Sequence, residues 1–234
     1  MLVCALYLFI IDDKKESTVD NENLTLPKNS CILPASNQII KKTTSLLYIV
    51  GFCLFLLGLM ASLRGSVYSI YLNKSFPHLG LHWLGIIFML NPIIVVLFQT
   101  PVANFIDKKN KLLIMGWGIF LYGFGSFILS FASVFSLAIL SCVILTIGEM
   151  LSFATIPLIF YEGGDEDTKG RYIGLSQSIY GISVVVGPSI GAIIYSHLGG
   201  LFLWSSCGII GCVCLLICYL AVKSDLYIRT LPQD

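Results

Sequence analysis

Residues 135–160 read FSLAILSCVILTIGEMLSFATIPLIF, an apolar run that contains a single charged residue, Glu149. A helix needs roughly 20 mainly apolar residues to cross a bilayer, because the hydrocarbon core is about 30 Å thick. The run is therefore long enough to span a membrane as one helix. It also places one carboxyl group near the middle of that span, where a charge is costly and usually functional.

Five other stretches have the same apolar character and length. They are residues 45–70, 81–103, 112–132, 172–195 and 201–222. Only 12% of the 234 residues are charged and 56% are hydrophobic, whereas about a quarter of a soluble domain is charged. We therefore predict an all-α integral membrane protein in which residues 45–222 form a six-helix bundle inside the lipid bilayer.

The basic residues gather on one side of these spans. Twelve of the fourteen Lys and Arg residues fall in the terminal segments or in alternate connections, namely Lys14, Lys15, Lys28, Lys41, Lys42, Lys108, Lys109, Lys111, Lys169, Arg171, Lys223 and Arg229. An excess of lysine and arginine marks the cytoplasmic loops of membrane proteins. The sequence thus predicts a multi-pass protein of the cell membrane with both termini, including the tail 223–234, in the cytoplasm.

The segment before the first span has a different composition. Residues 1–11 are apolar but too short to span a bilayer, and they lack the basic start of a signal peptide. Residues 12–44 are polar and typical of a flexible linker. We interpret residues 1–11 as the last turns of a helix whose beginning is missing, and residues 12–44 as a cytoplasmic linker. The alternative is an interfacial anchor at the start of a small intact protein.

Several function classes are disfavoured by composition and motifs. The net charge of +1 argues against nucleic acid as a partner, which requires clustered Lys and Arg. Cys212, Cys214 and Cys218 suggest a metal site, but helical geometry puts Cys212 and Cys214 on different faces and no histidine is near. The chain has no serine-hydrolase, zinc-protease, Walker A or Rossmann motif. We predict no enzyme activity, no metal and no cofactor.

Two connections carry a family resemblance. Residues 103–111, ANFIDKKNK, resemble the short cytoplasmic motif of the major facilitator superfamily, with Asp107, Lys108 and Lys111 on its charged positions. The stretch from Gly148-Glu149-Met150 to residues 169–175, KGRYIGL, is similar to the tenth helix and following loop of proton-coupled multidrug efflux members. The fifth span resembles the Gly- and Pro-rich motif of antiporter members.

The resemblance implies a fold and a function. The six spans would be helices 7–12 of a twelve-helix transporter, and the partner would be a missing N-terminal six-helix half or a second copy. The expected activity is proton-coupled efflux of hydrophobic or cationic small molecules by alternating access. The alternative is a six-helix protein that does not transport, either a scaffold or a fragment of a decayed or split transporter.

The intramembrane polar residues are the candidates for the proton and substrate site. Glu149 can exchange a proton or bind a cation, or can simply bond a neighbouring helix as a neutral acid. Arg64 can pair with Glu149 or extend its side chain outward to the interface. Asn91 and Gln99 are eight residues apart and share a helix face within about 80°. They can line the substrate cavity or bridge two helices.

The cytoplasmic motif and the fifth span supply candidates for moving parts. Asp107 lies just past the second span, where Arg171 or a helix N-terminus can bond it and so close a cytoplasmic gate with Lys108 and Lys111. Ordinary positive-inside topology is the alternative for the two lysines. The hinge candidates are Gly181, Gly187, Pro188 and Gly191, which allow close helix approach and a kink, although such glycines also serve plain packing.

The orientation can be tested with a reporter protein fused after Asp167. Because that loop carries Lys169 and Arg171, we expect a fluorescent reporter to be active there and a secreted phosphatase to be inactive. The same fusions placed after Lys74 should give the opposite pattern. An extracytoplasmic reporter after Asp167 would contradict both the span count and the orientation.

Overall fold

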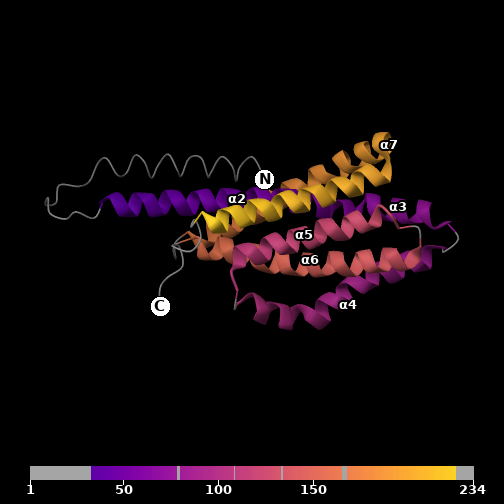
Figure 1. Ribbon diagram of the computed structural model, residues 1–234, viewed down its shortest axis with the longest axis horizontal. Helices are drawn as coiled ribbons and strands as arrows, with labels where there is room; N and C mark the ends of the chain where they lie inside the picture. Colours follow the sequence, from indigo (N-terminus) through magenta and orange to yellow (C-terminus); the bar gives the residue numbers. More distant parts are fainter. Residues whose placement is uncertain (1–32, 78–79, 108, 133, 165–167, 225–234) are drawn as a thin grey trace. The chain divides into compact units, whose positions relative to one another are not determined.

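The computed structural model describes residues 33–77, 80–107, 109–132, 134–164 and 168–224, and these parts are helical, without a strand among them (Figure 1). The helices are α2 (Leu33–Gly65), α3 (Val67–Ser75), α4 (Gly80–Ile106), α5 (Lys111–Leu129), α6 (Phe135–Glu162) and α7 (Lys169–Lys223). The predicted all-α fold class is confirmed. Residues 1–11, most of the predicted linker and most of the tail lie outside the described residues.

The chain separates into two compact units, Met1–Lys41 and Lys42–Asp234. In the first unit only the beginning of α2 is described. This helix starts at Leu33, inside the stretch 12–44 for which the sequence predicts a linker. The apolar part of α2 starts at Leu46, close to the predicted start of the first span. The second unit contains the remaining helices and the candidate site.

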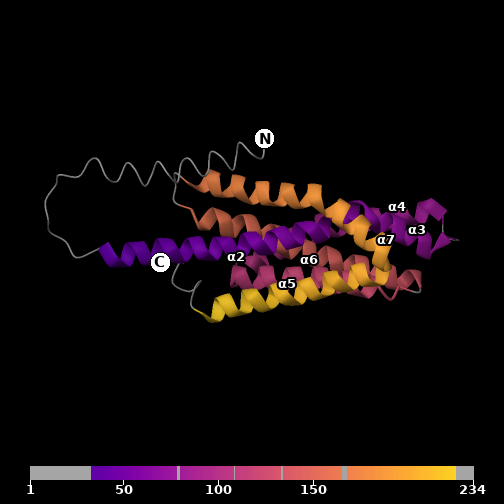
Figure 2. The same ribbon diagram turned by 90° about the horizontal axis from the view of Figure 1, so that it is seen from above.

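Within the described residues, five helices are long and apolar enough to cross a membrane. The 55-residue helix α7 is the longest, but its backbone leaves helical geometry at Gly199, where φ is 82° and ψ is 172°. Figure 2 shows that α7 runs along the bundle and then returns in the opposite direction. We refer to residues 169–198 as the first arm and to residues 200–223 as the second arm. The predicted spans 172–195 and 201–222 therefore each lie within one arm.

The first predicted span, 45–70, is divided rather than continuous. Helix α2 ends at Gly65 and α3 begins at Val67, because Ser66 adopts φ −122° and ψ −80°, outside the helical region. The Ser66 hydroxyl donates to the Ser62 carbonyl at 3.0 Å, which satisfies an acceptor that the break leaves free. The break at Ser66 comes two residues after Arg64, so the last turn of α2 carries the intramembrane cation.

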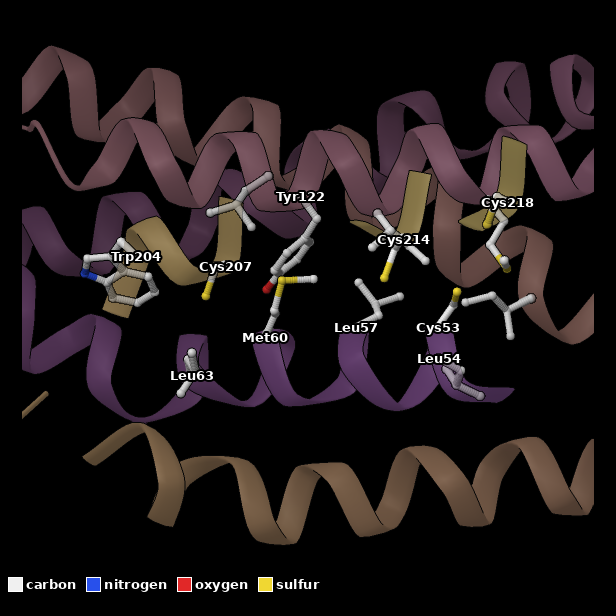
Figure 3. Close-up of a cluster of buried hydrophobic side chains, with 14 of the residues drawn as sticks. Cys53, Leu54, Leu57, Met60, Leu63, Tyr122, Trp204, Cys207, Cys214 and Cys218 are labelled. Atoms are coloured by element: carbon white, nitrogen blue, oxygen red, sulfur yellow. The ribbon is translucent and has the colours of Figure 1, made fainter. Parts of the chain in front are cut away.

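One face of α2 packs on the second arm of α7. Figure 3 shows Cys53, Leu57 and Met60 pointing from α2 toward Tyr122 of α5 and the cysteines of that arm. Cys53, Cys214 and Cys218 belong to one buried cluster, and their sulfur atoms lie in the space between α2 and this arm (Figure 3). These side chains are all buried. They therefore fill the core as small apolar groups do.

Another face of α2 packs on the first arm of α7 through very small residues. A Cβ added at Gly58 would lie 1.9 Å from the Ser183 Oγ, and one added at Gly187 would lie 1.8 Å from the Ser62 Oγ. At Gly191 it would lie 2.0 Å from the Leu63 Cδ2. Small residues let two helices approach closely inside a bilayer. Helix α2 is thus held between the two arms of α7.

Helices α5 and α6 meet backbone to backbone. A Cβ at Gly148 would lie 2.4 Å from the backbone nitrogen of Tyr122 and 2.6 Å from the carbonyl oxygen of Gly118. Both neighbours are backbone atoms, which cannot rotate away as a side chain can. The contact sets the position of the residue after Gly148, which is Glu149.

We therefore expect Gly148→Ala to lower the free energy of unfolding by about 1–3 kcal/mol, because the added methyl group overpacks the contact between α5 and α6. Chemical unfolding of the purified protein in detergent measures this change. The matched control is Gly174→Ala, where an added Cβ meets nothing within 4 Å and should stabilise the helix slightly. Equal stability of the two variants would contradict the close packing.

Candidate functional site

Three polar side chains meet in the interior of the bundle. The Arg64 Nη1 atom lies 2.8 Å from the Glu149 Oε2 atom, and the Asn91 amide nitrogen lies 2.8 Å from the same oxygen. Arg64 comes from the last turn of α2, Asn91 from the middle of α4 and Glu149 from α6. Two donors from two other helices therefore converge on one carboxylate oxygen.

Two further residues of α6 complete this cluster. The Asn91 amide also donates to the Thr146 Oγ1 atom at 3.0 Å, and the Arg64 Nη2 atom lies 3.4 Å from the Cys142 sulfur. Cys142, Thr146 and Glu149 have the spacing i, i+4 and i+7, so they form one stripe along a helix. We call these five residues, Arg64, Asn91, Cys142, Thr146 and Glu149, the polar cluster.

The polar cluster shows which of the alternatives for Arg64 applies. The Arg64 side chain is only 14% exposed and its guanidinium group points at Glu149, so it does not extend to the interface. A charge in the bilayer core costs several kcal/mol unless it is paired or hydrated. The two opposite charges offset much of this cost for each other, and the hydrogen bond that Asn91 donates to Glu149 Oε2 stabilises the carboxylate further.

Glu149 also lines a pocket of about 250 Å³. The other lining residues come from α2, α6 and the first arm of α7, and they are Leu54, Phe153, Ile156, Pro157, Ser176, Gln177 and Tyr180. The Phe153 and Tyr180 rings meet edge to face with their centroids 5.3 Å apart. The pocket thus combines an aromatic wall with a carboxylate, a hydroxyl and an amide. Such a mixture is typical of small-molecule sites.

Gln99 does not join the polar cluster. It is exposed and lies about two turns beyond Asn91 on α4. Eight residues on a helix leave a rotation of about 80° as well as an axial displacement, and the partners of Asn91 are out of reach there. A role for Gln99 in binding substrate stays a prediction.

The predicted cytoplasmic gate residues are located near helix ends. Asp107 is exposed directly after α4, and Lys111, the first residue of α5, forms an ion pair with Glu162, the last residue of α6. Arg171 lies in the first turn of α7, whereas Lys108 is outside the described residues. The ion pair joins α5 to α6. The Asp107 to Arg171 contact stays a prediction.

The hinge candidates differ in their surroundings. Gly187 and Gly191 are buried against α2, as described above, whereas an added Cβ at Gly181 meets nothing within 4 Å. Pro188 lies inside helix α7. Close packing therefore explains Gly187 and Gly191 in this conformation, and a hinge function for these four residues stays a prediction.

Sequence reasoning missed several residues of the site. Cys142 and Thr146 could have been found from their spacing, because they lie on the same helix face as Glu149. Ser176, Gln177 and Tyr180 carry a weaker signal, since their span also contains other polar residues that the structure leaves outside the pocket.

Comparison with known proteins extends this description. The chain matches the model of the Major Facilitator Superfamily over residues 1–230. It is 30% identical over 120 residues to YttB, an uncharacterized MFS-type transporter of Bacillus subtilis (strain 168). This match covers 49% of the chain and 30% of YttB. It is 28% identical over 149 residues to the riboflavin transporter RibZ of Clostridioides difficile (strain 630). That match covers 60% of the chain and 31% of RibZ. Each match thus spans less than a third of the relative's length. No solved structure matches the chain.

The pairing of Arg64 with Glu149 can be measured with a double-mutant cycle. We expect Glu149→Gln to lower the free energy of unfolding by about 3 kcal/mol, because it leaves the Arg64 guanidinium group buried without a counter-charge. The double variant Arg64→Met with Glu149→Gln should recover part of this loss, since neither charge remains. Thermal and chemical unfolding in detergent give the four stabilities.

The control for this cycle is Gln99→Leu, which alters an exposed residue of α4 and should change stability by less than about 0.5 kcal/mol. If the losses of Arg64→Met and Glu149→Gln were strictly additive, the two side chains would not interact and the ion pair would be rejected.

Proposed function

The chain belongs to the major facilitator superfamily of membrane transporters, and on this premise we propose that it forms one half of a secondary transporter that exports small molecules in exchange for protons. Membership makes it a multi-pass membrane protein and points to transport rather than catalysis. One observation carries the finer proposal. The same carboxylate, Glu149, pairs with Arg64 and lines the pocket.

A proton on Glu149 changes the balance within the polar cluster. The ionised carboxylate neutralises Arg64, whereas the protonated acid leaves the guanidinium group without a counter-charge in a medium of low dielectric constant. Arg64 then has to reach water or another partner. Because Arg64 is at the end of α2 and Glu149 is in α6, protonation favours a different arrangement of these two helices. Alternating access requires such a link between occupancy and conformation.

The pocket indicates the class of substrate. Its aromatic and aliphatic wall favours a hydrophobic compound, and Ser176, Gln177 and Glu149 offer hydrogen-bonding groups at its edge. A cationic compound is a second candidate, because a substrate cation can replace Arg64 as the partner of Glu149. RibZ is named for the transport of riboflavin, which adds flat aromatic solutes with polar edges to the candidates.

The completed transporter needs a second half. In pseudo-symmetric transporters the substrate site lies between two repeats. Large apolar side chains are exposed along α4 and along the first arm of α7, among them Ile86, Met89, Ile93, Val96, Leu97, Val185 and Ile193. In a membrane, such surfaces contact either lipid or the helices of a partner bundle. We propose that an N-terminal six-helix half or a second copy of this chain covers part of them, in the cell membrane and with both termini in the cytoplasm.

The proton-coupled activity is tested by Glu149→Gln in the complete transporter. The amide keeps the shape of the side chain but cannot exchange a proton, so we expect export driven by a pH gradient to fall at least tenfold when it is measured per amount of folded transporter in the membrane. The measurement is the uptake of an added fluorescent aromatic compound into everted membrane vesicles with an acidic interior, because uptake into such vesicles corresponds to export from the cell. The control Glu162→Gln removes the same charge at the far end of α6 and should retain export.

Full gradient-driven export by Glu149→Gln would reject the assignment of the proton site. Absence of export from the unaltered transporter, over a panel of neutral aromatic and cationic compounds, would instead favour the alternative of a membrane protein that does not transport.

A further inference from the structure

The Asn91 side chain uses both hydrogens of its amide group within the polar cluster. One is donated to Glu149 Oε2 at 2.8 Å and the other to Thr146 Oγ1 at 3.0 Å. A carboxamide can in principle rotate by 180° and present its carbonyl oxygen instead. Whether Asn91 is a donor or an acceptor toward Glu149 therefore depends on what Thr146 permits.

The Thr146 hydroxyl group favours one orientation of the Asn91 amide. It donates its single hydrogen to the Cys142 carbonyl oxygen at 2.8 Å, so its oxygen can only accept from Asn91. A rotated amide would place the Asn91 carbonyl oxygen against the Thr146 oxygen, and two acceptors would face each other unless the hydroxyl group gave up its hydrogen bond to Cys142. Thr146 is completely buried, so water does not relieve this conflict.

We propose that Thr146 is a positioning residue that holds Asn91 as a hydrogen-bond donor to Glu149 and thereby sets the pH at which Glu149 takes up its proton. The inference rests on the proposed function, in which that proton drives transport. A donor from Asn91 stabilises the ionised carboxylate, whereas a carbonyl oxygen in the same place would accept the hydrogen of the protonated acid. Thr146 thus acts through Asn91 without touching the carboxylate itself.

The other groups around Glu149 do not take over the influence that Thr146 has on its protonation through Asn91. Arg64 faces it from α2, Tyr122 from α5, Tyr180 from the first arm of α7 and Cys142 from its own helix. Among these, Arg64 alone is charged near neutral pH. Arg64 favours the ionised carboxylate whatever Asn91 does. The orientation of Asn91, which α4 contributes, is therefore the adjustable part of the cluster.

A purely structural role for Thr146 predicts a different behaviour. A threonine hydroxyl that bonds the carbonyl four residues earlier is common in membrane helices, and its loss would lower stability without moving any pH profile. The distinguishing quantity is therefore the pH midpoint of Glu149 protonation, and stability alone does not separate the two roles.

The experiment is an infrared titration of the purified chain in lipid bilayers. The protonated-carboxyl band that disappears in Glu149→Gln reports the protonation of Glu149. In Thr146→Val the amide is free to rotate, so we expect the midpoint to move to higher pH by about one unit, a tenfold gain in proton affinity. Thr146→Ser keeps the hydroxyl group and should titrate like the unaltered chain. An unchanged midpoint in Thr146→Val would overturn the proposal.

A second cycle tests whether Thr146 acts through Asn91. Asn91→Leu should raise the midpoint at least as much as Thr146→Val, and combining the two should add nothing further. Additive shifts would overturn the mechanism. If Thr146→Val does not fold, Thr146→Ala takes its place in both comparisons.

The proposed function and this inference can fail separately. Transport that persists in Glu149→Gln rejects the proton site and with it the inference. Transport that is lost in Glu149→Gln, together with an unchanged pH profile of export in Thr146→Val, rejects the role of Thr146 alone.

Discussion

A buried charge in the middle of a membrane has to be paired, and the pairing of Arg64 with Glu149 organises the interior of this bundle. The two side chains are only 14% and 31% exposed and are much less hydrated than at a surface, so each charge stabilises the other only if their helices hold them within hydrogen-bonding distance. Their separation of 2.8 Å ties the last turn of α2 to the centre of α6. Asn91 of α4 donates a hydrogen bond to the same carboxylate oxygen. Three helices are thus connected at one carboxylate, and the pocket opens beside it.

Close helix packing makes this arrangement possible. The small residues between α2 and the first arm of α7 bring these helices together, and the contact of Gly148 with the backbone of α5 leaves no freedom in the position of α6. On the opposite face of α2, the thiols and aliphatic side chains of Figure 3 fill the space toward the second arm. The helices that carry the cluster are therefore fixed by apolar contacts on several sides, and the ion pair does not have to hold the bundle together alone. Because apolar contacts hold the helices in place, Arg64 and Glu149 can exchange each other for other partners without loss of the bundle.

The sequence was sufficient for the membrane spans and insufficient for the polar cluster, and the reason lies in the range of the interactions. Hydropathy is a local property, so the spans could be located to within a few residues. The backbone change at Ser66 has no comparable local signal. The choice between pairing and outward extension for Arg64 depends on the rotation of α2 relative to α6, two helices separated by 85 residues in the chain. Spacing alone grouped Asn91 with Gln99, yet their different depths along α4 bring Asn91 alone to Glu149.

Under the proposed mechanism, one carboxylate serves three competing partners. Arg64, a proton and a cationic substrate each neutralise Glu149, and the low dielectric constant of the site makes it costly to leave the carboxylate unpaired or to leave Arg64 without a counter-charge. Arrival of a proton or a cation therefore displaces Arg64, and departure of either one restores the ion pair. A hydrophobic neutral substrate does not compete for the charge, but it occupies the pocket beside it and excludes the water that a displaced guanidinium group needs. Competition for one charge and for one space is enough to couple two fluxes, without any contact that joins proton and substrate directly.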